Sequence, residues 1–276
     1  MTAAPARDLT SAPPRSRWLG FAPFIVLSVI HVGARAVGAD DLAAPTKLTL
    51  MPLLALGALW GLRRNGSIGS ASAAPSGSSA PSGSTSAAPS GRALPVVLLF
   101  AALLFSWLGD GAGAFFPFAP ELPVMLGAFG VAHICYIWLF VRYVADRPFP
   151  RWALVYPLWW VLMLVVLWPV LGSLSLAVAA YGIVLAGTAA AAARCGAVVA
   201  AGGVLFLASD TILSFRIFMP EAMPDWTSAM VMLTYCAGQG LIIAGVLLRR
   251  PGGRTGGRTV PATAASRAGS DTRPGR

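Results

Sequence analysis

The chain has few charged residues. Asp, Glu, Lys and Arg make up 11% of its 276 residues, whereas about 25% is usual for a soluble domain. Hydrophobic residues make up 57%. This composition excludes an ordinary soluble domain and indicates an integral membrane protein.

Cysteine and histidine are also scarce. The three cysteines, Cys135, Cys195 and Cys236, lie in or beside apolar runs without close-paired spacing, so we expect neither disulfides nor a cysteine metal cluster. The two histidines, His31 and His133, are too few for a three-histidine zinc site, although a mixed carboxylate site stays open. We expect no metal and no other cofactor.

Long apolar runs fill most of the chain, and they lack the strict two-residue alternation of a membrane β-strand. At roughly 20 residues per span, they predict an all-α transmembrane bundle of about eight helices within a domain over 18–248. The expected spans are 18–37, 45–62, 93–110, 123–144, 152–169, 173–193, 197–218 and 226–248.

Basic residues are distributed unevenly over the two sides of this topology. Seventeen of the 20 lie on one side, and only Arg35, Lys47 and Arg216 lie on the other. The positive-inside bias then places both termini in the cytoplasm. Because the basic residues follow the topology, we expect no nucleic-acid partner. Many arginines beside a single lysine are typical of a GC-rich bacterial genome, so we expect the bacterial plasma membrane.

Two segments, 65–92 and 249–276, have the composition of disordered chain. Residues 65–92 repeat APSGS and are rich in Ser, Ala, Gly and Pro, which predicts a cytoplasmic linker without structure of its own. Residues 1–17 and the Arg-rich and Gly-rich residues 249–276 are expected to be cytoplasmic tails.

Two aspartates lie inside apolar runs of membrane-spanning length. Asp110 follows SWLG, and Asp210 lies in FLASDTILSF. A carboxyl group at membrane depth costs several kcal/mol unless it is partnered, neutral or facing water, so such a residue marks a functional site by default. The structural alternative is a polar clamp between helices.

Further polar residues lie in the same spans or in neighbouring ones. Residues three, four or seven apart share a helix face, so each helix concerned has one polar face that must avoid lipid. We expect these faces to point at one another and to form a pocket that opens outward. The residues are Lys47, His133, Tyr136, Tyr235 and Gln239.

Five segments, in order along the chain, carry a family resemblance. They are TKLTLMPLL (46–54), the Gly109-Asp110 pair, FGVAHICYIWLF (129–140), LFLASDTILSFRIF (205–218) and MLTYCAGQGLIIAG (232–245). The chain resembles the YhhN-like lysoplasmalogenase family of polytopic membrane hydrolases over nearly all of 18–248. The insertion at 65–92 is not expected in a typical member. The resemblance implies hydrolysis of the vinyl ether bond of a lysoplasmalogen, a lysophospholipid, to a fatty aldehyde and a glycerophospho-alcohol.

The two aspartates suit this reaction. A vinyl ether is hydrolysed when an acid protonates its β-carbon and an anion stabilises the oxocarbenium ion, which water then captures. Two neighbouring carboxyl groups can divide these tasks between an acid and a carboxylate. We therefore expect Asp110 and Asp210 to be catalytic. The greater expected depth of Asp210 favours it as the acid, although the sequence leaves the assignment open.

The other polar residues have expected roles around this pair. Lys47 would hold the phosphate headgroup or pair with Asp110. The remaining four, each equally compatible with a plain interhelical hydrogen bond, would orient water or the glycerol oxygens: His133, Tyr136, Tyr235 and Gln239.

Other classes of protein also use intramembrane carboxyl groups. A transporter or proton-coupled carrier would place Asp and His along an ion pathway, but the two halves of the chain show no convincing repeat. A lipid-binding or lipid-sensing protein would bind lysolipid and release no aldehyde. Headgroup preference, chain length and oligomeric state are not encoded in any of these patterns.

Overall fold

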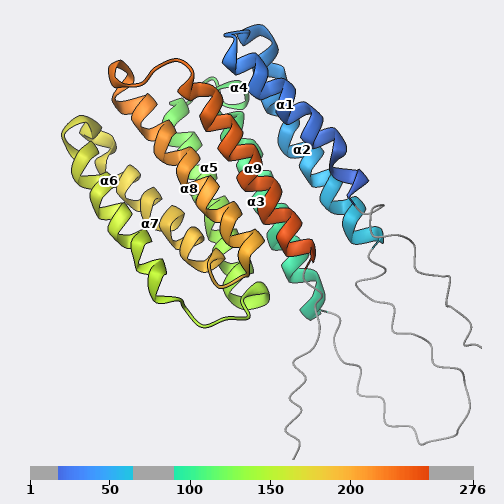
Figure 1. Cartoon of the computed structure of the whole chain (residues 1–276). Coiled ribbons are helices and arrows are strands. Elements are labelled where there is room, and N and C mark those ends of the chain that lie inside the picture. Colours follow the sequence, from blue (N-terminus) through green and yellow to red (C-terminus); the bar gives the residue numbers. More distant parts are fainter. Residues whose placement is uncertain (1–17, 65–89, 249–276) are drawn as a thin grey trace, which may run out of the picture.

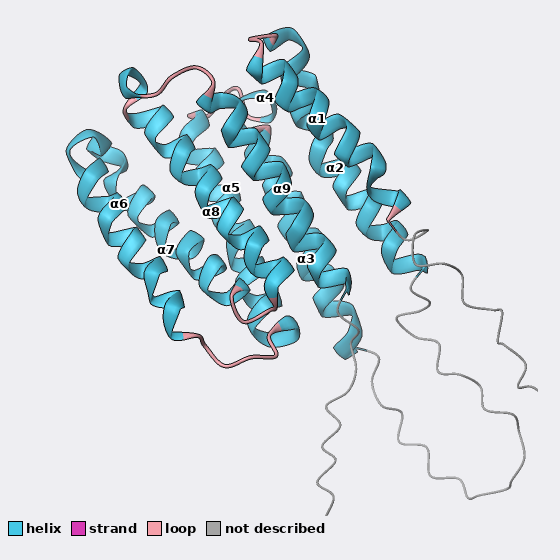
Figure 2. Ribbon diagram, in the orientation of Figure 1, coloured by secondary structure: helices cyan, strands magenta, loops and turns pink. Residues whose placement is uncertain are grey.

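The chain folds as an α-helical bundle (Figures 1 and 2). The structure, a computed structural model, describes residues 18–64 and 90–248. Every regular element in these two ranges is helical, which confirms the predicted all-α bundle. The long helices are α1 (Ala22–Ala36), α2 (Asp40–Arg64), α3 (Ser90–Asp110), α5 (Glu121–Leu139), α6 (Val155–Leu171), α7 (Ser175–Ala192), α8 (Ala197–Phe218) and α9 (Thr227–Leu248).

Short elements connect or extend the long helices. One turn of helix, α4 (Ala112–Phe115), connects α3 to α5, and a π-helical segment at Phe140–Val144 extends α5. The remaining short pieces are 3-10 turns at Leu19–Phe21, Arg151–Leu154, Gly172–Leu174 and Pro220–Ala222.

Seven stretches of the described chain are long and apolar enough to cross a membrane. The longest, Arg151–Ala192, has 42 residues and contains both α6 and α7. The chain reverses between them at Gly172, whose φ of +54° is unfavourable for a residue with a side chain. The protein is therefore a multi-pass membrane protein.

The helix boundaries differ from the predicted spans by a few residues. Helix α2 begins at Asp40 and α3 at Ser90, earlier than the expected 45 and 93. The predicted tails at 1–17 and 249–276 and the linker up to residue 89 lie outside the described residues.

The helices form three groups across the bundle. Helices α1 and α2 pair at one side, α6 and α7 lie at the opposite side, and α3, α5, α8 and α9 lie between them (Figure 1). Helix α6 packs mainly on α7 and α8. The central helices carry both aspartates, so the bundle interior holds the candidate site.

Two glycines allow a close contact between α8 and α9. A Cβ atom on Gly202 would lie 2.8 Å from the carbonyl oxygen of Gly238, and one on Gly238 would lie 2.8 Å from the backbone nitrogen of Phe206. Small residues allow membrane helices to approach to backbone contact in this way. The contact fixes the separation of the helices that carry Asp210 and Tyr235.

A proline in α2 allows a hydrogen bond between α2 and α3. Pro52 has no N–H, so the carbonyl of Leu48, four residues earlier, has no helical hydrogen-bond partner. The indole nitrogen of Trp107 on α3 donates to that carbonyl at 2.8 Å. This bond ties α2 to α3 directly beside Lys47 and Asp110.

Candidate active site

Asp110 is the last residue of α3, and its side chain is only 4% exposed. The Tyr235 hydroxyl on α9 donates to Oδ2 at 2.7 Å. The Nζ of Lys47 on α2 lies 3.9 Å from Oδ1. Both carboxyl oxygens of Asp110 are therefore engaged, one by a neutral donor and the other by a cation.

Asp210 lies within α8 and has different partners. The Tyr181 hydroxyl on α7 donates to Oδ2 of Asp210, and the Nε2 atom of His133 on α5 lies 3.9 Å from the same oxygen. Within the two described ranges, no Lys or Arg nitrogen lies within 4.0 Å of this carboxyl group. The contacts of Asp210 thus involve one oxygen and leave Oδ1 available.

Both ring nitrogens of His133 contact a hydroxyl group. Its Nε2 lies 3.3 Å from the Tyr181 hydroxyl, and its Nδ1 lies 3.1 Å from Oγ1 of Thr188. Because the Thr188 hydroxyl donates to the carbonyl of Val184 at 2.9 Å, it accepts from Nδ1–H. The Nε2 atom therefore faces both the Tyr181 hydroxyl oxygen and Oδ2 of Asp210.

Aromatic rings join the two carboxyl groups into one site. The Phe206 ring packs edge-on against Tyr235, with centroids 5.5 Å apart, and against His133 at 4.8 Å. Asp110 and Asp210 are close enough to interact electrostatically. Six helices thus contribute side chains to a single site: α2, α3, α5, α7, α8 and α9.

Tyr136 and Gln239 lie one layer deeper than the carboxyl groups. The Tyr136 hydroxyl donates to Oε1 of Gln239 at 2.6 Å, and Nε2 of Gln239 donates to Ser106 at 3.0 Å. All three side chains are fully buried. Gln239 also contacts the Tyr235 hydroxyl, so this layer supports Tyr235 and does not touch either aspartate.

Tyr181 is the site residue that the sequence reasoning missed. It lies in a mostly apolar helix, and its ring contacts His133 with centroids 5.6 Å apart. The available signal was its spacing of seven residues from Thr188, which places two hydroxyl groups on one face of α7.

His31 and Arg35 serve to hold α1 in place. Nδ1 of His31 lies 2.8 Å from the Thr46 hydroxyl on α2. Arg35 pairs with Asp40 at 2.6 Å and donates to Ser228 on α9 at 2.8 Å. These bonds fasten α1 to α2 and α9, so both residues hold helices together.

The site offers acids, phenols and one cation. Two carboxyl groups, two tyrosine hydroxyls, one imidazole and one ammonium group converge there. Within residues 18–64 and 90–248 no three His, Cys, Asp or Glu side chains are placed to ligate one metal ion. The chemistry that this set can perform is proton transfer and stabilisation of a positive charge.

Comparisons with known proteins assign the chain to a family. A search of the curated proteins and a search of the solved structures each found no match. The model of the YhhN family matches residues 42–246, a range that includes every site residue from Lys47 to Tyr235. The match covers well over half of the chain and confirms the resemblance seen in its sequence segments. The chain belongs to the YhhN family, the family of the lysoplasmalogenases.

Proposed function

We propose that the protein hydrolyses the vinyl ether bond of lysoplasmalogens and releases a fatty aldehyde and a glycerophospho-alcohol. The main observation behind the proposal is the pair of buried aspartates, which lie within electrostatic reach of each other but have different partners. Membership of the YhhN family supports a membrane hydrolase of the lysoplasmalogenase type.

The partners of the two aspartates suggest separate roles. Asp110 suits the carboxylate because Lys47 and Tyr235 engage both of its oxygens. Asp210 suits the acid because its contacts all involve Oδ2, which leaves Oδ1 to carry a proton. Pairs of carboxyl groups in unlike environments divide acid and anion roles in this way.

The reaction begins with proton transfer to carbon. Asp210 gives its proton to the β-carbon of the vinyl ether, where the electrons of the double bond form the new C–H bond. The ether oxygen then shares a lone pair with the adjacent carbon, and the resulting oxocarbenium ion is stabilised by the Asp110 carboxylate. General acid catalysis of this kind contributes roughly 10²- to 10⁴-fold.

Water completes the reaction. A water molecule adds to the oxocarbenium carbon and returns a proton to the Asp210 carboxylate, which restores the acid and leaves a hemiacetal. The hemiacetal hydroxyl proton moves to the former ether oxygen as the C–O bond breaks. The net change is vinyl ether plus water to aldehyde plus alcohol, with both aspartates regenerated.

The proposal is tested by measuring aldehyde release from a synthetic lysoplasmalogen by the purified protein in detergent. We expect aldehyde from the vinyl ether and none from the matched saturated alkyl ether, because only the vinyl ether has a carbon that can be protonated. In D₂O the aldehyde should carry one deuterium on the carbon next to the carbonyl. Well-folded protein that releases no aldehyde would refute the proposal.

Lys47 is expected to recognise the phosphate of the headgroup. Its side chain is 36% exposed while its ammonium faces Asp110, so it can bridge the site and a phosphate. Lys47→Ala should lower kcat/KM for a lysoplasmalogen by about tenfold, the value of a charged hydrogen bond. Lys47→Arg is the control. It keeps the positive charge and should lower kcat/KM less.

An alkenyl glycerol without phosphate separates two explanations of the Lys47→Ala defect. If Lys47 binds phosphate, the variant should hydrolyse this substrate as well as the wild type does. Equal losses on both substrates would instead mean that Lys47 acts by holding the Asp110 carboxylate.

A further inference from the structure

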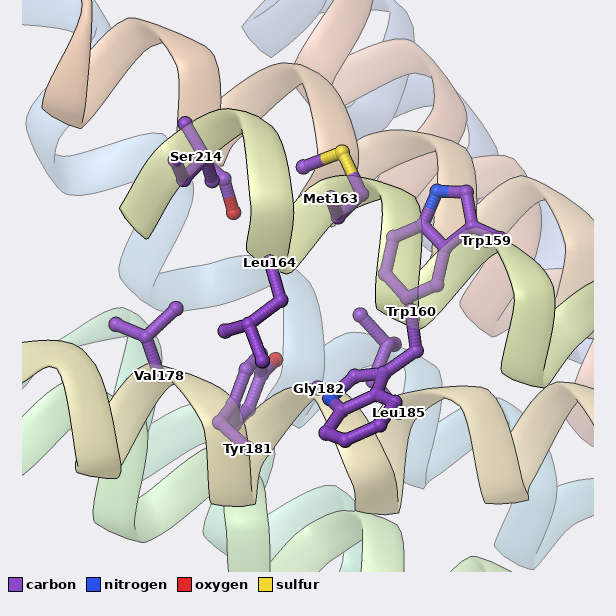
Figure 3. Close-up of a pocket in the computed structure, with 10 residues that line it drawn as sticks. Trp159, Trp160, Met163, Leu164, Val178, Tyr181, Gly182, Leu185 and Ser214 are labelled. Atoms are coloured by element: carbon purple, nitrogen blue, oxygen red, sulfur yellow. The ribbon is translucent and has the colours of Figure 1, made fainter. Parts of the chain in front are cut away.

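An apolar crevice lies between α6, α7 and α8 (Figure 3). The space between its walls is about 370 Å³, a figure that includes the part open to the outside. Leu164 of α6 and Val178 and Tyr181 of α7 project into it, and the Trp160 indole lies beside Gly182 (Figure 3). A Cβ atom on Gly182 would lie 2.6 Å from Cδ1 of Trp160, so glycine is what lets this indole pack against α7.

Polar groups along the crevice are already bonded within the protein. The Trp160 indole nitrogen donates to the carbonyl of Ala179 at 3.0 Å, and the Ser214 hydroxyl donates to the carbonyl of Asp210 at 2.7 Å. The Tyr181 hydroxyl donates to the Asp210 carboxyl group. A molecule in the crevice therefore contacts mainly carbon atoms. This environment suits a hydrocarbon, whereas a polar ligand would lose its hydrogen bonds to water without replacement.

Tyr181 connects the crevice to the carboxyl pair. Its ring forms part of the crevice wall, and its hydroxyl contacts Oδ2 of Asp210. A molecule that fills the crevice up to this ring therefore ends next to Asp210. Asp110 and Lys47 lie farther along, on α3 and α2, at the other side of the site.

The crevice lies at the lipid-facing edge of the bundle. Helix α6 packs mainly on α7 and α8 and presents a row of exposed apolar side chains. Leu158, Leu162 and Val165 are 67%, 60% and 67% exposed. In a membrane this surface faces acyl chains, so a lipid tail reaches the crevice without passing through water.

We propose that this crevice binds the hydrocarbon chain of the lysolipid and so sets the direction in which the substrate lies. The proposal rests on the proposed function for the reaction that follows. In a vinyl ether the double bond joins the first two carbons of the chain, and the second of these receives the proton. A chain that enters the crevice at Tyr181 places that carbon beside Asp210. The ether oxygen and the glycerol phosphate then extend towards Asp110 and Lys47.

Filling the crevice tests the proposal through chain-length preference. Val178→Trp should lower kcat/KM for a hexadecenyl lysoplasmalogen on the order of tenfold, as added bulk in a hydrocarbon pocket does. It should change the value for a butenyl analogue less than about twofold, because that chain ends before the obstruction. Ile183→Trp is the matched control, since Ile183 is on the same helix, β-branched and 56% exposed away from the crevice. Leu164→Trp with Leu162→Trp as its control repeats the comparison on α6.

A labelling experiment tests the crevice independently of turnover. The probe is a lysophosphatidylcholine with a diazirine in its acyl chain, photolysed with the protein in detergent and mapped by mass spectrometry. We expect crosslinks at residues of the crevice wall, competed by unlabelled lysophosphatidylcholine, reduced by Val178→Trp and unchanged by Ile183→Trp.

Two results would overturn the crevice assignment. One is an equal loss on long and short chains in the Val178→Trp and Leu164→Trp variants; the other is labelling that Val178→Trp does not reduce. If the wild type releases no aldehyde from either chain, the proposed reaction fails and the labelling result alone decides whether the crevice binds a lysolipid chain.

Discussion

Asp210→Asn should reduce aldehyde release from a lysoplasmalogen by at least about 10³-fold, within the range lost when a general acid is removed. Asparagine keeps the shape of the side chain and its contact with Tyr181, but it has no proton to give to carbon. Helicity by circular dichroism and elution in detergent should match the wild type.

Asp225→Asn is the control for this variant. Asp225 is an exposed aspartate in the connection between α8 and α9 and lies outside the site. It should retain full activity. Full activity in Asp210→Asn would remove Asp210 from the mechanism and leave it as a polar contact between α7 and α8.

Asp110→Asn should lower kcat by about 10²- to 10³-fold, the usual loss when a preorganised group that stabilises transition-state charge is removed. The neutral amide no longer balances the oxocarbenium ion, and Lys47, 3.9 Å from Oδ1, becomes an uncompensated cation beside it. Glu121→Gln, at the exposed first residue of α5, is the control and should stay active.

A cationic analogue distinguishes the two aspartates. A lysolipid with a secondary ammonium in place of the ether oxygen mimics the oxocarbenium charge. Asp110→Asn should bind it at least about tenfold more weakly, the cost of one lost charged contact, whereas Asp210→Asn should keep its affinity. If Asp210→Asn bound the analogue more weakly and Asp110→Asn kept its affinity, Asp210 would be the carboxylate and Asp110 the acid.

The helices were predictable because a hydrocarbon layer imposes a length on every span. Even the break within the 42 apolar residues of Arg151–Ala192 was expected between 169 and 173, where Gly172 now reverses the chain. The helix ends that face polar segments were less predictable, because hydropathy gives no sharp limit there. Helix α2 begins at Asp40 and α3 at Ser90, before the expected spans begin at 45 and 93.

The site was only partly predictable from the sequence. Periodicity shows which face of a helix is polar, but it does not show which other helix packs against that face. Asp110 and Asp210 stood out because a carboxyl group is costly in lipid. Tyr181 did not, because one tyrosine in an apolar run is ordinary; its role depends on α7 being rotated towards α8. Tyr136 shared a face with His133, yet its hydroxyl bonds to Gln239, which in turn bonds to Ser106, and this places Tyr136 below the carboxyl pair.

The residues below the carboxyl groups affect how a proton can move across the bundle. Towards the end where α3 begins and α9 ends, the buried side chains include Leu99, Leu139, Phe140, Ile242 and Ile243. In that direction the described helices bury no Asp, Glu, Lys, Arg or His below His133. Among the described residues, a proton exchanged at the site therefore has no series of buried carboxyl, ammonium or imidazole groups along which to leave by the opposite end. In the proposed reaction, proton exchange at the carboxyl pair would then leave the proton gradient across the membrane intact.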